Sequence, residues 1–447
     1  MNVLRELTLS YQKIGAPQSI LLALSGGADS VALLHLLSEL QKTNPFELIC
    51  VHINHGLREA SAGEEQFVKS LCEKAGIRLF TKRVSVPKTG NLEEAARTAR
   101  YKAIHHVQTE TGAQVIALAH HANDQAETVL MHLMRGAGLD GIAGMSEFRP
   151  PYWRPLLRVP QKDLLAYLNQ RQFKWVEDES NQDTRLLRNN LRHGLLSLLE
   201  EQSPGVVLRL AQTADILKAE QNLLHHLQNA WLNQYAKMQL PFNFLLINPW
   251  MHQELAMKRR LVRALCRPVC GELDYAQTER LVAFVMESSA SSLNLPRNAK
   301  AILSKERLHI LPDDVKLTKL TWQQPLAAPA KEGMGDCLRE QVVDEASIAS
   351  AVMRQVSPDD VISPLGMQGT QPIRKYLIAK GIDRPFRPFW PVYALGNQVL
   401  WVPGCGVSST AAVTQNTVSK VKLVFSGILP HEINENGGKT SCTNNPS

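Results

Sequence analysis

The stretch from Ile20 to Leu34 constrains the fold of this chain more than any other part of its sequence. A continuous apolar run ends at Ser25-Gly26-Gly27, and Asp29 then opens a second apolar run with helical spacing at Val31, Leu34, Leu37 and Leu40. The pattern predicts a strand, a tight glycine turn and a helix. Glycine lets backbone N–H groups approach a ligand closely, and a helix N-terminus favours anions. We therefore expect a phosphate site at this turn.

Asp29 determines which kind of phosphate site the turn can form. A Walker A loop would need a longer glycine-spaced run followed by Lys-Ser or Lys-Thr, and here Asp29 stands in place of the lysine. A carboxylate among phosphates is repelled unless a divalent cation lies between them, so we predict Mg²⁺ bridging Asp29 and the pyrophosphate part of a nucleotide. An ordinary capped strand-to-helix turn is the alternative interpretation.

The turn also carries a resemblance to a known family. Its residues Ser25, Gly26, Gly27, Ala28, Asp29 and Ser30 resemble the Ser-Gly-Gly-x-Asp-Ser signature of the PP-loop ATP pyrophosphatases. Enzymes of that family cleave ATP between the α- and β-phosphates and transfer AMP to a carbonyl oxygen. The resemblance implies that ATP is the nucleotide and that these six residues bind it.

Strand-like and helical segments alternate from the N-terminus to about residue 135, which predicts an α/β fold with a doubly wound parallel sheet. In such a fold the loops at the carboxyl ends of the strands build the site, and here they begin at Ser25, His52 and His120. We expect a PP-loop domain over 1–205, a helical domain over 206–311, a linker over 312–345, a small α+β domain over 346–426 and a disordered tail over 427–447.

The composition, 44% apolar and 20% charged, is that of a soluble globular protein. No apolar stretch reaches the length of a bilayer span and the first residues lack the order of a signal peptide, so we expect a cytoplasmic protein without membrane association. The net charge of +7 favours an anionic partner. The seven cysteines form no Cys-x-x-Cys pair, which argues against disulfides and a cysteine-bound metal.

Two further segments place polar side chains near the expected nucleotide. The segment after the second strand carries His52, His55 and Arg58, and we expect Arg58 against a phosphate or a substrate carboxylate. Polar strand-end residues satisfied locally are the alternative. On the helix over 91–111, Glu94, Arg97 and Tyr101 share one face beside Arg100, which suits an exposed ion pair and a site role equally.

The start of the helix after His120 carries a pair of carboxylates. Asn123 can cap this helix, and Asp124 and Glu127 then project from the same side of its first turn because they are spaced i, i+3. The pair suits a cationic amine. Favourable interaction with the helix dipole is the alternative reason for acidic residues at this position.

Several motifs together resemble the tRNA(Ile)-lysidine synthetase family among PP-loop enzymes. They are His52 to Arg58, His120 to Thr128, Arg135 to Met145, Trp153 to Leu157, Glu177 to Asn181 and Arg188 to Arg192. The resemblance is dense from residue 20 to about residue 195 and returns at 354–366 and 374–404. The helical middle is only weakly matched.

That resemblance implies a specific reaction. ATP adenylates the C2 carbonyl oxygen of the wobble cytidine in the CAU anticodon of tRNA(Ile), and the ε-amine of free L-lysine then attacks C2, leaving lysidine, AMP and pyrophosphate. It further implies catalytic roles for Asp29, His120, Asp124 and Glu127, lysine binding by Asp124 and Glu127, and ATP binding by the turn with His52 and Arg58. The residue that accepts the amine proton is left open, and no protein partner is implied beyond a homodimer.

RNA binding needs basic residues outside the nucleotide site. Arg185, Arg188 and Arg192 fall at i, i+3 and i+7 and predict a basic helical stripe, suited to nucleic acid or to ATP phosphates. Arg374, Lys375, Arg384 and Arg387 alternate with the aromatic residues Tyr376, Phe386, Phe389 and Trp390. We expect the basic side chains to contact RNA and the aromatic side chains to pack in a core.

Three other interpretations of the chain are compatible with the Ser25 to Ser30 motif. PP-loop tRNA thiolases would need catalytic or cluster-binding cysteines, and the chain has no Cys-x-x-Cys pair. GMP synthetase and asparagine synthetase lack this combination of loops. A non-catalytic ATP-binding regulator would need neither the carboxylate pair nor the extra basic domains.

Overall fold

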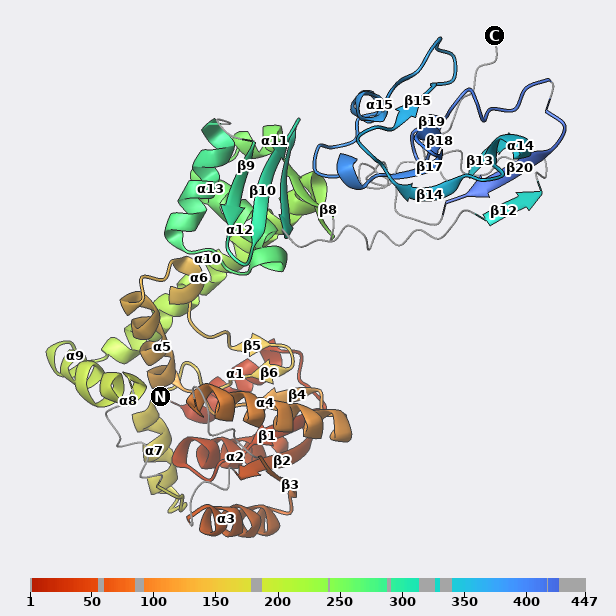
Figure 1. The fold of residues 1–447 in the computed structure, drawn as a ribbon. Helices are drawn as coiled ribbons and strands as arrows, with labels where there is room; N and C mark the ends of the chain where they lie inside the picture. The colour runs from red at the N-terminus through yellow and green to blue at the C-terminus, as the bar shows by residue number, and fades with distance from the viewer. Residues whose placement is uncertain are drawn as a thin grey trace. The chain divides into compact units, whose positions relative to one another are not determined.

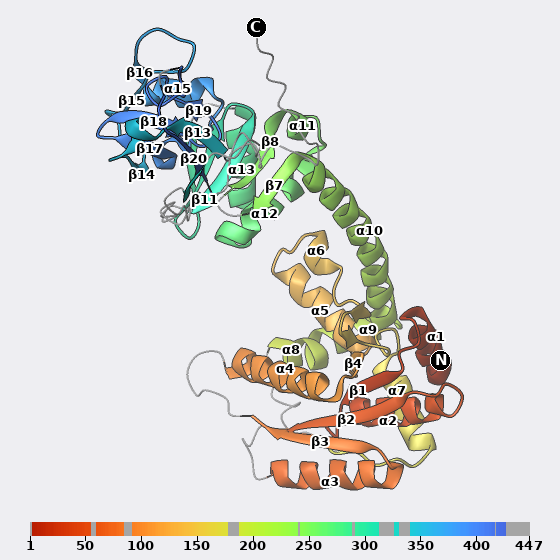
Figure 2. The same cartoon turned by 90° about the vertical axis from the view of Figure 1, so that its right-hand side faces the viewer.

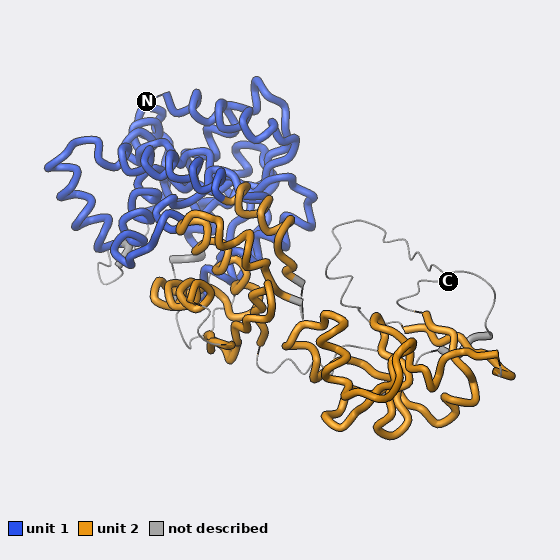
Figure 3. Tube along the Cα trace, turned by 90° about the horizontal axis from the view of Figure 1, so that it is seen from above, with its two compact units in different colours: residues 1–224 blue, residues 225–447 orange. Residues whose placement is uncertain are grey.

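The computed structural model (Figure 1) describes most of the chain: residues 2–54, 60–84, 92–177, 187–239, 242–287, 291–312, 326–329, 340–415 and 417–425. The chain divides into two compact units, residues 1–224 and 225–447 (Figure 3). None of the helices in the described ranges is long and apolar enough to cross a bilayer. The predicted tail, residues 427–447, lies outside the described residues.

Unit 1 is built on a six-stranded sheet in the order β3-β2-β1-β4-β6-β5. Its strands are β1 (Ser19–Ala23), β2 (Glu47–Asn54), β3 (Arg78–Arg83), β4 (Val115–Ala117), β5 (Phe148–Arg149) and β6 (Tyr152–Trp153). All neighbouring strands are parallel except the β5–β6 pair. The chain passes outward from β1 to β3 and then returns to β4 on the other side of β1. The carboxyl ends of β1 and β4 therefore flank the switch point where ligands bind in open α/β sheets.

Helices cover both faces of this sheet (Figure 2). They are α1 (Val3–Lys13), α2 (Ala28–Gln41), α3 (Ala60–Ala75), α4 (Leu92–Thr111) and α7 (Gln161–Gln170), whereas α5 (Ala122–Met134) and α6 (Leu139–Ile142) extend away from the sheet (Figure 2). Ile20 and Leu22 of β1 pack with α1, α2, α3 and α7, whereas Leu21 packs with Ile104 and Val107 of α4. Since β1 is covered on both sides, its sequence is continuously apolar. The predicted α/β fold class is confirmed.

A run of helices follows the sheet. It comprises α8 (Leu187–Asn190), a π-helical turn (Leu191–Leu195), α9 (Leu196–Gln202) and α10 (Val206–Tyr235). Leu196, Val207 and Ala211 from this run pack against Ala122, Ala126 and Leu130 of α5. The run is thereby anchored to the helix that carries the predicted carboxylate pair.

The first half of unit 2 contains predicted helices and a sheet that the sequence pattern did not predict. Its elements are β7 (Ala236–Gln239), β8 (Phe242–Leu246), α11 (Ile247–Met251), α12 (Leu255–Cys270), α13 (Tyr275–Glu287), β9 (Ser292–Leu295), β10 (Ala299–Ser304) and β11 (Arg307–Pro312). The five strands form an antiparallel sheet in the order β7-β8-β11-β10-β9. Such short strands carry little periodicity of their own, which is why the stronger helical pattern dominates the sequence.

The second half of unit 2 is built on two small sheets. Its elements are β12 (Leu326–Pro329), β13 (Glu340–Asp344), α14 (Glu345–Ile348), β14 (Val352–Gln355), β15 (Val361–Ile362), β16 (Gln371–Pro372), α15 (Ile373–Ala379), a 3₁₀ turn (Arg387–Phe389), β17 (Pro391–Leu395), β18 (Gln398–Val402), β19 (Gly406–Val407) and β20 (Lys420–Val424). β12 and β13 lie in the range expected to be a linker, and both pair with β20. Tyr376, Phe386 and Trp390 are buried in the core and Phe389 packs against it, as predicted.

Candidate active site

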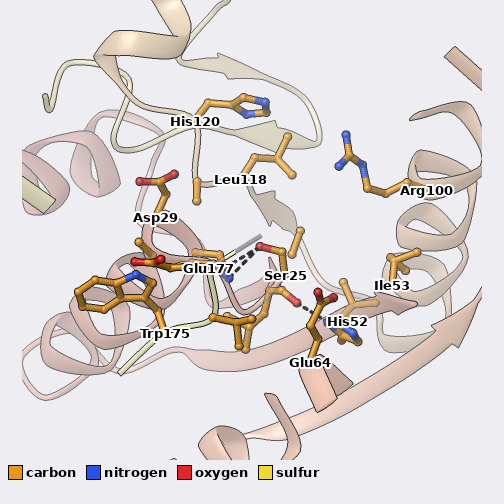
Figure 4. Close-up of a pocket in the computed structure, with 18 of the residues that line it drawn as sticks. Ser25, Asp29, His52, Ile53, Glu64, Arg100, Leu118, His120, Trp175 and Glu177 are labelled. Carbon is orange, nitrogen blue, oxygen red and sulfur yellow. Dashed lines mark hydrogen bonds between the residues drawn. The ribbon is translucent and has the colours of Figure 1, made fainter. Parts of the chain in front are cut away.

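A cavity of about 690 Å³ opens at the carboxyl ends of β1, β2 and β4. Its walls come from the glycine turn, α4, α7, the segment 175–177 and the π-helical turn. Figure 4 shows Asp29 and His120 on one side of the cavity and Arg100 facing them from α4. The three loops predicted from the sequence to build the site, those after Ser25, His52 and His120, each contribute to these walls.

The glycine turn is held in shape by its own serine hydroxyls. The Gly26 N–H donates to Ser30 Oγ at 3.2 Å, and the Gly27 N–H donates to Ser25 Oγ at 3.3 Å. Ser30 Oγ in turn donates to the Gly27 carbonyl at 3.0 Å, and the Val176 N–H donates to the Gly26 carbonyl at 3.0 Å. Because Gly27 is the N-cap of α2, the first-turn N–H groups of that helix have no helical partner and are directed to this end. An anion bound at the turn would lie at the positive end of α2.

A side chain at Gly26 should destabilise the fold more than a side chain at Gly27, and this difference is testable. Gly26 has φ +96°, and a Cβ there would lie 3.2 Å from Val68 Cγ2. Gly27 has φ −72°, and the nearest atom to its Cβ would be Ser25 Oγ at an ordinary 3.6 Å. We expect Gly26→Ala to lower the free energy of unfolding by about 1–2 kcal/mol and Gly27→Ala to change it by less than about 0.5 kcal/mol. Thermal unfolding of both variants checks this, and equal losses would contradict it.

Asp29 lies beside two side chains from distant parts of the chain. Gln161 Nε2, at the start of α7, donates to Asp29 Oδ1 at 3.3 Å. His121 Nε2 lies 3.4 Å from Asp29 Oδ2 and 3.5 Å from Asp124 Oδ2, and the His121 side chain is only 1% exposed. His121 therefore joins the phosphate turn to the predicted carboxylate pair. Burial alone would lower the pKa of His121, but the carboxylates of Asp124 and Asp29 raise it above its ordinary value.

The prediction that Asn123 caps α5 was wrong by two residues. The N-cap is His121 rather than Asn123, because the backbone of His121 is extended and helical geometry begins at Ala122. Asp124 consequently takes the third helical position, where its Oδ2 accepts the His121 backbone N–H at 3.0 Å. The Asn123 side chain instead accepts the Gln161 backbone N–H at 3.0 Å and so ties α5 to α7.

Asp124 and Glu127 converge as their spacing predicts, and both contact Arg192. Arg192 Nε donates to Glu127 Oε1 at 2.6 Å, and Nη2 donates to Asp124 Oδ1 at 3.1 Å. The Glu127 side chain is fully buried, and that of Arg192 is 23% exposed. Burial alone would lower the pKa of Arg192, but the ion pairs with Glu127 and Asp124 raise it. Arg192 therefore holds its positive charge firmly between the two acidic side chains.

Arg192 accordingly does not lie on an exposed basic stripe. The predicted i, i+3, i+7 spacing assumed a regular α-helix, whereas Arg192 lies in the π-helical turn and its guanidinium faces the carboxylates. Arg185 lies outside the described residues, and the side chain of Arg188 is not described. In unit 2, Arg374, Lys375 and Arg384 are exposed. Burial lowers the pKa of Arg387, the Asp383 carboxylate opposes this shift, and Arg374 and Arg384 add to it.

The remaining predicted residues are placed as follows. His52 lines the cavity, and its Nδ1 is 2.9 Å from the Leu24 carbonyl, so this nitrogen is satisfied locally. His120 lines the cavity at the end of β4. Arg100 and Tyr101 also line it, whereas His55 and Arg58 lie outside the described residues, as does the side chain of Glu94.

Sequence reasoning gave no site role to several residues that the structure places at the cavity or directly beside it, among them His121, Gln161, Trp175 and Glu177. His121 could have been found from its position next to His120. Glu177 begins one of the motifs that resemble the family, but no site role was predicted for it. Gln161 and Trp175 reach the cavity by tertiary packing of α7 and the segment after it, and no local pattern marks them. Figure 4 shows Trp175 and Glu177 on the same side of the cavity as Asp29.

The residues present fit a magnesium ion shared with a nucleotide rather than one enclosed by protein. The described part of the chain contains no cluster of three or more His, Cys, Asp or Glu side chains suited to a metal. Mg²⁺ commonly takes one or two carboxylates together with substrate phosphates and water. The Asp29 carboxylate, 31% exposed at the phosphate turn, can supply that single ligand.

Comparison with known proteins assigns the family. Residues 2–199 match the PP-loop domain, and residues 351–423 match the TilS substrate C-terminal domain. The tRNA(Ile)-lysidine synthase of Geobacter sulfurreducens is 30% identical over 427 residues, which cover 88% of this chain and 90% of that protein. A protein of that name from Thermus thermophilus is 32% identical over 88% of this chain and 70% of its own length. The tRNA(Ile)-lysidine synthase of Caldanaerobacter subterraneus subsp. tengcongensis is 29% identical over 95% of this chain and 96% of that protein. By its two matched domains and its near full-length similarity to these enzymes, the chain belongs to the tRNA(Ile)-lysidine synthase family.

Proposed function

We propose that this protein uses ATP to ligate L-lysine to C2 of the wobble cytidine in the CAU anticodon of tRNA(Ile), through an adenylated cytidine and with release of AMP and pyrophosphate. One observation carries the proposal. His121 Nε2 lies within 3.5 Å of both Asp29 and Asp124, so the phosphate turn and the carboxylate pair belong to one site. A site with both parts can activate a carbonyl oxygen and receive an amine at the same place.

The ATP end of the site is the glycine turn with Asp29. We assign the phosphate oxygens to the first-turn N–H groups of α2 together with Ser25 and Ser30, whose hydroxyl oxygens lie 3.0 Å apart at the same turn. Mg²⁺ held by Asp29 would neutralise charge on the departing pyrophosphate. We assign His120 to the transferred AMP because it lines the same cavity at the end of β4, and His52 and Arg58 to the nucleotide as well.

The lysine end is the carboxylate pair. Arg192 holds Asp124 and Glu127 beside each other through its guanidinium, and a pair of carboxylates can bind an ammonium group and accept a proton from it. The amine proton would leave to one of these two carboxylates as nitrogen attacks C2. For RNA we assign Arg374, Lys375, Arg384 and Arg387 in unit 2, together with Arg185 and Arg188 in unit 1, to backbone phosphates.

The thiolase alternative has no support at the cavity. Of the described cysteines, Cys50, Cys72, Cys266 and Cys270 are buried and Cys405 is partly exposed, and none of the described residues that line the cavity is a cysteine. A thiolation reaction would need a thiol or a thiolate-bound cluster at that position.

The decisive experiment measures AMP release from ATP with unmodified tRNA(Ile) and lysine. We expect AMP and pyrophosphate in equal amounts, with turnover that requires both lysine and the tRNA. A matched control is the same tRNA with the wobble cytidine replaced by uridine, which should release no AMP. ADP as the product, or turnover indifferent to lysine, would overturn the proposal.

A further inference from the structure

The first turn of α2 does not by itself decide where the Asp29 carboxylate points. Asp29 is the second residue of the helix, and its side chain is 31% exposed at the cavity. An aspartate side chain at such a position has several allowed rotamers, and only some of them direct an oxygen to a cation on bound phosphates. Among the described residues, the hydrogen-bond and ion-pair partners of Asp29 come from outside α2. Those partners therefore determine the direction of the carboxylate.

The Asp29 carboxylate is contacted at both of its oxygens. Gln161 Nε2 lies 3.3 Å from Oδ1 and 3.5 Å from Oδ2, and His121 Nε2 lies 3.4 Å from Oδ2. An ionised carboxylate has about four lone-pair positions on its two oxygens. The two contacts can therefore orient Asp29 and still leave an oxygen lone pair for a cation in the cavity.

Gln161 is itself fixed by a residue from a third element. It is the first residue of α7, and the N-cap of that helix, Pro160, makes no side-chain cap hydrogen bond. The backbone N–H of a first helical residue has no partner within its own helix. Here Asn123 Oδ1, in the first turn of α5, accepts the Gln161 N–H at 3.0 Å. The Ala122 N–H also donates to the Val159 carbonyl at 2.9 Å, so two hydrogen bonds join the start of α5 to the start of α7.

The rest of α7 is anchored without the Gln161 side chain. Leu164 and Leu168 are fully buried in the core of the sheet. Arg171, directly after the helix, pairs with Glu39 of α2 at 2.7 Å. The Gln161 side chain instead lines the cavity. Replacing it should therefore leave α7 in place and change what contacts Asp29.

We propose that Gln161 is a positioning residue for the Asp29 carboxylate, and that Asn123 fixes Gln161 from the first turn of α5. The inference rests on the proposed function for the role of Asp29, which is to hold the Mg²⁺ that is bound together with ATP. Side chains that hydrogen-bond a metal ligand orient it, and replacing one typically costs about 10–100-fold in metal affinity or activity.

The test measures metal binding directly on the full chain. Mn²⁺ replaces Mg²⁺, because it accepts the same oxygen ligands and the electron paramagnetic resonance signal of free Mn²⁺ reports how much is bound. The nucleotide is α,β-methylene-ATP, which cannot be cleaved between its α- and β-phosphates. The variants are Gln161→Leu, Asn123→Ala and the two combined. Gln170→Leu, which replaces an exposed glutamine at the other end of α7, is the matched control.

We expect Gln161→Leu to weaken Mn²⁺ binding about tenfold and Asn123→Ala to weaken it less. The combined variant should bind no more weakly than Gln161→Leu alone, because effects that act through the same contact are not additive. Gln170→Leu should bind as wild type does. Unchanged Mn²⁺ affinity in Gln161→Leu, or losses that multiply in the combined variant, would overturn the positioning role.

The magnesium dependence of AMP release separates positioning from general damage to the fold. In Gln161→Leu, the Mg²⁺ concentration for half-maximal turnover should rise by about the same factor as the loss in Mn²⁺ affinity. Saturating Mg²⁺ should then restore turnover, and KM for lysine should not change. A loss of turnover that added magnesium leaves uncorrected would contradict the proposal, since a correctly placed Asp29 would then not be what the variant lacks.

The positioning role and the proposed function fail separately. The Mn²⁺ measurement contains neither tRNA nor lysine, so it decides on Gln161 whether or not the protein makes lysidine. Turnover indifferent to lysine would reject the function alone. Wild-type protein that binds no Mn²⁺ with the nucleotide analogue would reject both the metal role of Asp29 and its positioning by Gln161.

Discussion

Asp29→Ala is expected to reduce AMP release by about a thousandfold or more while leaving the protein folded. Asp29 is the carboxylate that the glycine turn presents to a nucleotide, and the described residues provide no metal-binding cluster that could replace it. Loss of a cation that neutralises phosphate charge is worth several kcal/mol, and about 4 kcal/mol corresponds to a thousandfold in rate. Single-turnover kinetics with tRNA and lysine in excess measures the loss, and thermal unfolding verifies the fold.

The stability part of this prediction follows from the exposure of Asp29. Its side chain is 31% exposed and lies in the first turn of α2, where a carboxylate contributes about 0.3–1 kcal/mol through the helix dipole. Asp29→Asn, which keeps the shape and removes the charge, should be as inactive as Asp29→Ala. Glu73→Ala, an exposed acidic residue on α3, is the control and should retain activity. Full activity in a folded Asp29 variant would remove the metal argument.

Glu127→Gln is expected to impair both catalysis and stability. Glu127 is fully buried and accepts Arg192 Nε at 2.6 Å, so the neutral amide would leave a guanidinium that is 23% exposed without its main counter-charge. Breaking a buried ion pair costs about 3–5 kcal/mol, and because Arg192 is partly exposed and keeps Asp124, we expect a loss of about 2 kcal/mol in the free energy of unfolding. Turnover should fall by about a hundredfold or more, since the amine loses one carboxylate.

A matched surface pair in the same unit serves as the control for Glu127. Glu39 pairs with Arg171 at 2.7 Å, with the two side chains 26% and 44% exposed. Glu39→Gln should cost less than about 1 kcal/mol and leave turnover unchanged, because exposed pairs are screened by solvent. The kinetic measurement compares KM for lysine with KM for ATP. In Glu127→Gln, KM for lysine should rise while KM for ATP stays constant. Equal stability losses at the two positions, or an unchanged response to lysine, would show that Glu127 is neither paired as described nor part of the lysine site.

The sequence by itself determined the local parts of this protein. The apolar run of β1, the glycine turn and the helical spacing of α2 are properties of neighbouring residues, and the structure has each of them at its predicted position. The convergence of Asp124 and Glu127 was predictable for the same reason, because i, i+3 spacing on a helix is a local relation. The strand and helix alternation then determined the fold class through the rules of parallel sheets.

Tertiary structure decided which groups meet. Gln161 reaches Asp29 across 132 residues of chain, and Arg192 reaches Glu127 across 65. No periodicity encodes such pairs, since they depend on how α7 and the π-helical turn pack against the sheet and α5. The antiparallel strands in the first half of unit 2 were not predicted for a related reason. Each has only four to six residues, which show too little periodicity, and hydrogen bonding to distant partners makes them strands. The sequence thus determined the elements and the chemistry they carry, whereas long-range packing determined the partners of each charged group.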